Sequence, residues 1–333
     1  MRHVAASLLL LLCACGREPD VVLYCALDQS FAEPVVRDFE QRTGLSVQAY
    51  YDVEANKSVG LRRRLQAEAG RPIGDVFWNN EVVQTTVLAR GGLLQPYRSP
   101  AAEGIPARFR DPGDLWCGFA ARGRVLIVNT ALRPDAAARP AGLADFLDPA
   151  NAGACGMAAP LTGTTAAHAA FWIARLGLPA VLQRFDALRA NGVSFASGNA
   201  HVMRLVRDGQ LAFGWTDTDD CQVAIDESYP VVMVVPDQRA GEDGLVLIPN
   251  SVALVQGAPH PDAGRRLIDF LLSEEVEALL AQGRSAQIPL RASVPRPPHV
   301  LDVSRVALAE VDWAAAGAAY DAGVAQLEAA FLR

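Results

Sequence analysis

The sequence predicts an α/β fold in which helices cross between the strands of a parallel sheet. Short apolar runs rich in β-branched residues alternate with longer amphipathic segments of helical period along most of the 333 residues. This succession is typical of parallel strand pairs, because a crossover helix brings the chain back to the same edge of the sheet. No internal repeat and no low-complexity linker separates the two halves, so we expect two lobes joined by strands.

The first part of the chain shows the alternation most clearly. Residues 21–25 form an apolar run, and residues 45–51 alternate between apolar and polar side chains; both patterns are typical of strands. Between them, apolar residues recur at helical spacing up to Gly44, a residue type that commonly ends helices. We expect strands over residues 21–25, 45–51 and 75–78, and helices over residues 31–43, 59–69 and 82–90.

The remainder of the chain continues the pattern. A long strand is expected over residues 119–129, and two short strands over residues 244–255, broken at Pro249 and Asn250. The Ala-rich region of residues 306–332 is expected to be helical. Residues 143–147, 155–159, 165–176 and 181–191 continue the alternation, followed by strands over residues 211–215 and 231–235 and helices over residues 262–272 and 274–281.

Composition excludes some classes of function. With 51% hydrophobic and 20% charged residues, the chain is long enough for one large domain or two ordinary ones. The formal net charge of −7 argues against nucleic acid or anionic lipid as a partner. Aromatic residues make up only 7% of the chain, which argues against an aromatic-lined sugar groove.

The N-terminus has the layout of a bacterial lipoprotein signal. A short basic start precedes an apolar run over residues 4–12, and Ala14 stands directly before Cys15. We expect residues 1–15 to be a signal that ends at a lipidated Cys15, with residues 16–20 as a polar tether. The alternative is a plain secretory signal that leaves a free protein. In either case we expect a periplasmic or cell-surface protein, because the apolar run is too short to span a bilayer.

Six cysteines remain to be explained. With Cys13 removed and Cys15 lipidated, four stay in the mature chain, and sequence cannot choose among their three possible pairings. An exported compartment permits disulfides, but buried free thiols are equally compatible with the sequence. These four residues are Cys25, Cys117, Cys155 and Cys221.

Eight short segments follow one another in a characteristic order along the chain: residues 22–29, 74–81, 91–97, 122–130, 160–165, 248–254, 259–261 and 267–273. This ordered set resembles the iron(III)-type periplasmic solute-binding proteins of ABC importers. The resemblance covers most of residues 21–295 and implies a type II periplasmic-binding-protein fold, in which two α/β lobes close on a ligand in the cleft between them. It also implies delivery of that ligand to a membrane permease by a protein that we expect to be monomeric.

The resemblance further implies a domain organisation and a metal-binding set. Residues 21–115 and 237–295 would form the first lobe, residues 116–236 the second, and residues 296–333 a C-terminal helical region. The expected second lobe lacks the consecutive tyrosine pair that ferric-binding members typically carry there, and Thr218-Asp219-Asp220 stands about where the pair would be. Carboxylates suit hard cations and would equally suit an organic ammonium group. The candidate metal ligands are Asp28, Glu54, Asp217, Asp219 and Asp220.

A set of possible anion-binding residues is also present. Residues 162–165 precede an expected helix, whose N-terminal N–H groups favour anions. Arg122 and Arg124 are two apart on a strand and share a face, so that one of them could clamp a phosphate, carbonate or phosphonate. The candidate ligand- or anion-binding residues are Asn80, Arg122, Thr162, Gly163, Thr164, Thr165 and Asn199.

Simpler roles remain open for the acidic residues. Asp217, Asp219 and Asp220 could form a turn and helix cap after a strand, Asp28 could cap the helix that follows it, and Glu54 could be a solvated loop charge.

We expect ferric iron or a ferric chelate as the transported ligand, and no catalytic cofactor. The alternative ligand is a small zwitterion or cation with a phosphoryl group, such as 2-aminoethylphosphonate or thiamine. No Gly-x-Ser-x-Gly, His-Glu-x-x-His, phosphate-loop or dinucleotide motif is present, so a metal-dependent phosphoesterase is a minor alternative. A sensory protein that docks on a membrane receptor is a third possibility.

Overall fold

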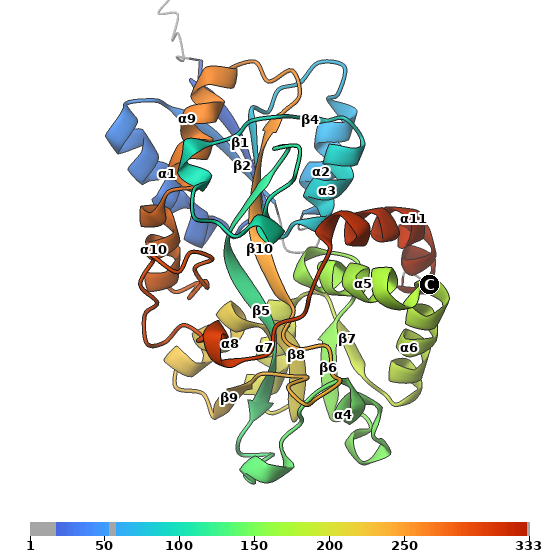
Figure 1. Ribbon diagram of the computed structural model, residues 1–333. Helices are drawn as coiled ribbons and strands as arrows, with labels where there is room; N and C mark the ends of the chain where they lie inside the picture. Colours follow the sequence, from blue (N-terminus) through green and yellow to red (C-terminus); the bar gives the residue numbers. More distant parts are fainter. Residues whose placement is uncertain (1–17, 53–57, 332–333) are drawn as a thin grey trace, which may run out of the picture.

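Two α/β lobes, one above the other in Figure 1, make up the computed structural model of this chain, which describes residues 18–52 and 58–331. The strands β5 (Cys117–Asn129) and β10 (Leu247–Val255) pair with each other and run through the middle of the molecule, from one lobe into the other. The two lobes are therefore joined by strands, as the absence of a linker predicted.

One mixed sheet runs through both lobes, in the order β2-β1-β3-β10-β5-β8-β6-β7, with β4 paired to β10 and β9 paired to β5. Pairing is parallel among β1, β2 and β3 and among β6, β7 and β8. It is antiparallel wherever β5 or β10 is a partner. The remaining strands are β1 (Val21–Cys25), β2 (Val47–Tyr51), β3 (Val76–Asn79), β4 (Leu94–Gln95), β6 (Cys155–Ala158), β7 (Ser194–Ala196), β8 (Phe213–Asp217) and β9 (Val231–Val234).

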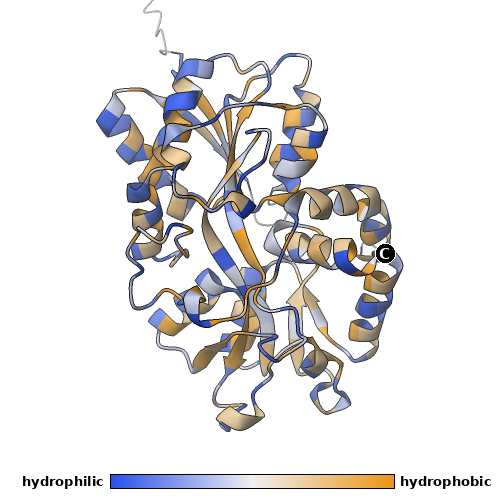
Figure 2. Ribbon diagram, viewed as in Figure 1, coloured by the Kyte–Doolittle hydropathy of each residue, from blue (hydrophilic) through white to orange (hydrophobic). Residues whose placement is uncertain are grey.

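The prediction of a parallel sheet is thus correct within each lobe and wrong for the two strands that join the lobes. Two consecutive strands can pair in parallel only when a crossover connection, usually a helix, joins them. Each of β5 and β10 instead runs from one lobe into the other and pairs in antiparallel fashion with its neighbours. Figure 2 shows apolar residues in the strands of both lobes and polar residues on outer helices such as α1 (Gln29–Thr43) and on loops, whereas α11 (Trp313–Phe331) is largely apolar.

Helices cover the faces of both lobes. Gly44 ends the first helix in the left-handed conformation, with φ of 70°, and its N–H donates to the carbonyl oxygen of Glu40, which is the predicted stop. The helices are α1 (Gln29–Thr43), α2 (Val59–Ala67), α3 (Val83–Arg90), α4 (Leu143–Leu147), α5 (Gly163–Leu176), α6 (Leu178–Ala190), α7 (Asn199–Arg207), α8 (Thr218–Asp226), α9 (Pro261–Leu271), α10 (Glu274–Gln282) and α11 (Trp313–Phe331).

The predicted break at Pro249 and Asn250 is wrong, because β10 is one strand with an irregularity at that point. Pro249 has no N–H to donate to a neighbouring strand. The side-chain amide of Asn250 donates instead to the carbonyl oxygens of Phe119 and Ala120 on β5. This side chain bridges the place where the ladder lacks a backbone donor, so the pairing of β10 with β5 continues past it.

The C-terminal helix spans both lobes on one side of the molecule (Figure 1). It packs against α3 of the first lobe and against α5 and α6 of the second. The hydroxyl of Tyr320 donates to the carbonyl oxygen of Leu161 over 3.1 Å, and Arg63 pairs with Glu328 over 3.0 Å. The predicted helical region therefore starts later than expected, at Trp313, and connects the lobes.

The segment from residue 237 to residue 245, assigned above to the first lobe, packs on the second. The N–H of Asp237 donates to the carbonyl oxygen of Ala141, and Leu245 belongs to the apolar cluster that contains Val125 and Val202. The chain thus enters the first lobe with β10 itself.

The predicted signal with Cys15 lies outside the described residues. Cys117, Cys155 and Cys221 are free thiols, and Cys25, Cys155 and Cys221 are buried. Of the two open alternatives, the structure therefore has free thiols at Cys117, Cys155 and Cys221. In the described part of the chain, none of the helices has both the length and the apolar character needed to cross a membrane.

Candidate functional site

A polar cavity of about 360 Å³ lies between the lobes and brings together most of the predicted ligand-binding residues. Gln29, Ser30 and Phe31 of α1 line it from the first lobe, and Met203 of α7 and Val223 of α8 add apolar surface from the second. Sequence reasoning did not predict these five residues as ligand-binding, because none of them carries a charge. The predicted residues that line the cavity are Asp28, Asn80, Arg122, Thr162, Gly163, Thr164, Asn199, Asp217, Asp219 and Asp220.

The fold explains why these residues meet. Asp28 follows β1, Asn80 follows β3, and Asp217 is the last residue of β8. Thr162 directly precedes α5, and Asn199 begins α7. In open α/β sheets the carboxyl ends of the strands and the starts of the helices meet in one crevice, and here the two lobes turn these ends toward each other.

Two predicted residues are not among those named above. Glu54 lies outside the described residues, so its prediction stays open. Thr165 is buried behind the wall, where its hydroxyl donates to the Oδ1 atom of Asn199 over 2.9 Å. The helix-capping alternative for Asp28 and Asp217 is not realised, because neither side chain makes a capping hydrogen bond to the helix that follows it.

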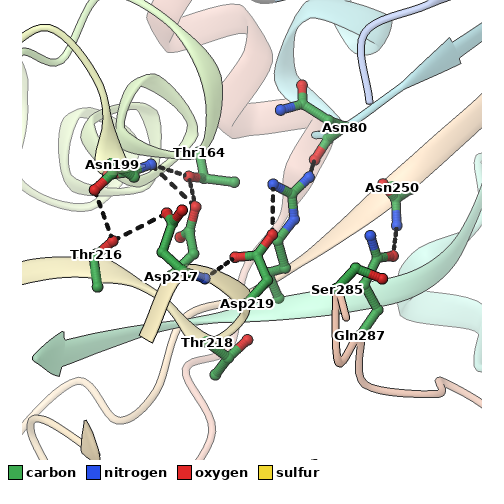
Figure 3. A network of polar contacts seen from close by, with 12 residues as sticks. Asn80, Thr164, Asn199, Thr216, Asp217, Thr218, Asp219, Asn250, Ser285 and Gln287 are labelled. Atoms are coloured by element: carbon green, nitrogen blue, oxygen red, sulfur yellow. Dashed lines mark hydrogen bonds and ion pairs between the residues drawn. The ribbon is translucent and has the colours of Figure 1, made fainter. Parts of the chain in front are cut away.

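Arg124 is enclosed by partners on the second lobe. It is fully buried, and its Nη1 atom lies 2.7 Å from Oδ1 of Asp217 and 3.0 Å from Oδ1 of Asn199. Its Nη2 atom donates to the hydroxyl of Thr165 over 3.2 Å. The other oxygen of Asp217 accepts from the Thr164 hydroxyl over 2.5 Å and from the Asn199 amide over 3.0 Å (Figure 3). Both oxygens of Asp217 are therefore engaged within the protein.

Arg122 is held more loosely and connects the lobes. Its Nη2 atom donates to the carbonyl oxygen of Asn80 over 2.5 Å, while its Nη1 atom lies 3.5 Å from Oδ2 of Asp219. Its Nε atom is buried and has no hydrogen-bond partner among the described residues. Burial opposes the charge of this guanidinium, but the neighbouring carboxylates, Asp219 first among them, keep the pKa of Arg122 above its ordinary value. Arg122 therefore presents a permanent positive charge to the cavity.

The other charges of the cavity are negative. One oxygen from each of Asp217, Asp219 and Asp220 lies within 4.8 Å of the others, and Asp28 adds a carboxylate from the first lobe. Four carboxylates against the guanidinium groups of Arg122 and Arg124 leave a formal excess of two negative charges. Such a set can hold a hard cation through oxygen ligands or pair with an organic ammonium group. Among the described residues, no tyrosine or histidine lines the cavity.

Two α/β lobes joined by strands, with one polar cavity between them, define a solute-binding protein. Residues 35–304 match the model of the family described as bacterial extracellular solute-binding protein. The chain belongs to this family, which places it among extracytoplasmic proteins that bind solutes for transport rather than among enzymes.

Curated relatives differ in the ligands that their names state. The chain is 24% identical over 312 residues to iron uptake protein A1 of Synechocystis, an alignment that covers 86% of this chain and 83% of the relative. It is 27% identical over 283 residues to a putative 2-aminoethylphosphonate-binding periplasmic protein of Salmonella paratyphi A, covering 80% of this chain and 76% of the relative.

Solved structures with this fold include iron-bound HitA from Pseudomonas aeruginosa, with a TM-score of 0.81 and 21% identity over 93% of this chain and 98% of that one. AfuA from Actinobacillus pleuropneumoniae, solved with fructose-6-phosphate, has a TM-score of 0.80 and 21% identity, covering 92% of this chain and 98% of that one. At this identity the likeness demonstrates the fold alone.

Proposed function

We propose that this chain is a lipid-anchored, monomeric solute-binding protein that binds a ferric chelate in the cavity and delivers it to an ABC permease. The observation that carries the proposal is the cluster of carboxylates around Arg122 in a cavity between two lobes. Hard cations prefer charged oxygen ligands, which Asp28, Asp219 and Asp220 supply. The iron-uptake relatives support this choice of cation.

A chelate suits the cavity better than a bare ion. About 360 Å³ is the size of a small-molecule pocket, and one ion with its protein ligands would leave much of it empty. The guanidinium of Arg122 would pair with the anionic part of the chelate while the carboxylates contact the metal. Binding would then draw on both charges of the cavity.

In this proposal the ligand closes the lobes by hinge bending. The proposed first lobe consists of residues 21–115 and 237–295, and the second of residues 116–236. The short segment 237–245 is the exception, because it packs on the second lobe. The hinge would be the paired strands β5 and β10, where Asn250 bridges the irregularity. Lipidation at Cys15 and a tether over residues 16–20 would keep the protein near its permease, because tethering raises the local concentration.

A second candidate ligand is a small zwitterion with an ammonium and a phosphoryl group, such as 2-aminoethylphosphonate. The pairing of Arg122 with Asp219 in one cavity favours it, since each charge matches one end of such a molecule. The absence of tyrosine from the described cavity wall and the relatives from Salmonella support it as well.

Calorimetry separates the two ligands. The soluble protein without its signal is titrated with ferric citrate, with Mn²⁺ and with 2-aminoethylphosphonate. Saturable heat from ferric citrate, lost in Asp219→Asn and retained in Asp226→Asn, is the expected result. Asp226 is the matched control because it lies on the same helix, α8, outside the cavity wall. Heat from the phosphonate alone would identify the zwitterion, rather than iron, as the ligand. No heat from any of the three titrants would refute both proposed ligands.

A further inference from the structure

The residues that the sequence marks as an anion-binding set do not point into open space. Arg124, Thr164 and Asn199 all direct hydrogen-bond donors at one carboxylate of the protein itself, that of Asp217. Figure 3 shows Thr164 and Asn199 turned toward Asp217 rather than toward Asn80 on the opposite wall. The hydrogen-bond donors of an anion site are therefore present, and the carboxylate of Asp217 occupies the position where a free anion would bind.

We propose that Asp217 is a built-in anion: its carboxylate fills a site that would otherwise take a small free anion, so that solute binding in the cavity requires no phosphate, carbonate or carboxylate from solution. This inference deepens the proposed function and rests on it for the solute. The filled anion site itself rests only on the contacts of Asp217.

The first argument is the number of bonds. Oδ1 of Asp217 accepts from Arg124, and Oδ2 accepts from Thr164 and Asn199, so three donors serve one carboxylate. Arg124 and Asp217 are both almost completely buried. A buried guanidinium requires a counter-ion because an unpaired charge is strongly disfavoured in the interior. Asp217 is that counter-ion.

The second argument is the backbone. Arg124 on β5 and Asp217 on β8 are direct partners in the antiparallel ladder. The side chains of directly opposite residues on paired strands are neighbours. The register of β5 against β8 therefore holds the carboxylate of Asp217 next to the guanidinium of Arg124. This pairing exists before any solute arrives, and closing of the lobes is not needed to form it.

The third argument is what remains for a solute. With Arg124 occupied, the guanidinium that lines the cavity is Arg122, which has only a loose contact of 3.5 Å with Asp219. A bound solute therefore finds one positive group and the carboxylates of Asp28, Asp219 and Asp220. The cavity thus offers a single guanidinium to the anionic part of a solute, while its carboxylates face the cationic part.

Chemical rescue tests the proposal without any metal. In Asp217→Ala the donors lose their carboxylate, and a small carboxylate from solution can take its place. We expect formate and acetate to raise the melting midpoint of this variant saturably, by about 4 °C or more over sodium chloride at equal ionic strength. Butyrate should do so much less, because it exceeds the space that the aspartate leaves.

Two proteins serve as controls in the same buffers. The wild type should show no such shift, since its site is filled. Asp262→Ala should show none either, because Asp262 is exposed and pairs with Arg265 on the surface. Equal shifts in all three proteins, or no shift in a folded Asp217→Ala, would overturn the proposal. A variant that folds in formate and not in chloride would support it.

The wild type provides a second measurement in case the variant folds in neither buffer. Its affinity for ferric citrate or 2-aminoethylphosphonate, whichever binds, should change by less than about threefold when excess phosphate or bicarbonate is added. A gain of tenfold or more would mean that the anion site is vacant, and the proposal would fail. Failure of both probes to bind would refute the proposed ligands, whereas rescue of Asp217→Ala by formate would stand independently.

Discussion

The two arginines of β5 stand two residues apart and have different surroundings. Arg124 is bound by Asp217, Asn199 and Thr165 at 2.7–3.2 Å, all on the second lobe. Arg122 reaches across to Asn80 on the first lobe and lies 3.5 Å from Asp219. The same residue type on the same face of one strand therefore has two roles: Arg124 is part of the permanent structure, and Arg122 can exchange its contacts for those of a ligand.

The largest effect is expected from Arg124→Ala. Removing one partner of a buried ion pair leaves Asp217 uncompensated, which costs about 3–5 kcal/mol of unfolding free energy. Denaturant unfolding checks this. Arg122→Ala is the comparison, with a smaller loss expected because its ion pair is longer and faces the cavity. Equal losses in the two variants would break the distinction between the arginines.

A pH-dependent effect is expected from a buried carboxylate on the first lobe. Glu81 at the start of α3 is bound by Asn79 and by the N–H groups of Val83 and Gln84. Burial raises its pKa from 4.5 to about 7. The folded state thus holds the proton more tightly than the unfolded state, and the stability this gives is complete below pH 4.5 and is lost as pH rises through 7.

The Glu81→Gln variant tests this contribution. Between pH 4.5 and 7 the wild type should lose about 3 kcal/mol that the variant does not lose, measured by denaturant unfolding at each pH. Asp262→Asn, on an exposed side chain, controls for general pH effects. Parallel stability profiles of Glu81→Gln and wild type would contradict this prediction, because they would mean that burial does not raise the pKa of Glu81.

Because Arg122 can exchange its contacts for those of a ligand, its substitution should change the affinity for the solute rather than the stability of the protein. Lysine is a point charge that cannot bridge Asn80, Asp219 and a solute as the planar guanidinium does. Arg122→Lys should therefore lower the affinity for the bound solute about tenfold, which is about 1.4 kcal/mol, with little change in melting midpoint. Calorimetry and thermal unfolding measure the two quantities. A loss of stability without loss of affinity would give Arg122 the structural role assigned to Arg124.

The smallest effect is expected behind the cavity wall. Thr165→Val removes the hydroxyl that accepts from Arg124 and donates to Asn199, which should cost about 1 kcal/mol of unfolding free energy. Because Thr165 does not line the cavity, solute affinity should stay within about twofold of the wild type. A larger drop in affinity would mean that the Arg124 network transmits strain to the cavity.

Much of the fold and about half of the chemistry of the site were predictable. Residues at strand ends and helix starts, such as Asp28, Asn80 and Asp219, were predicted as ligand-binding and do line the cavity. Which charge pairs with which was not predictable. Arg124 and Asp217 are 93 residues apart in the chain, and their pairing depends on the register of β5 against β8, which no local pattern contains.

The sequence by itself determined the succession of strands and helices, because apolar periodicity and residues such as Gly44 act on their immediate neighbours. It also determined which polar residues end the strands. The tertiary structure alone decided that β5 and β10 pair in antiparallel fashion, that α11 connects the lobes, and that Asp217 satisfies Arg124. These outcomes depend on contacts between distant segments, whose geometry is set only when the lobes pack and the strands choose their partners.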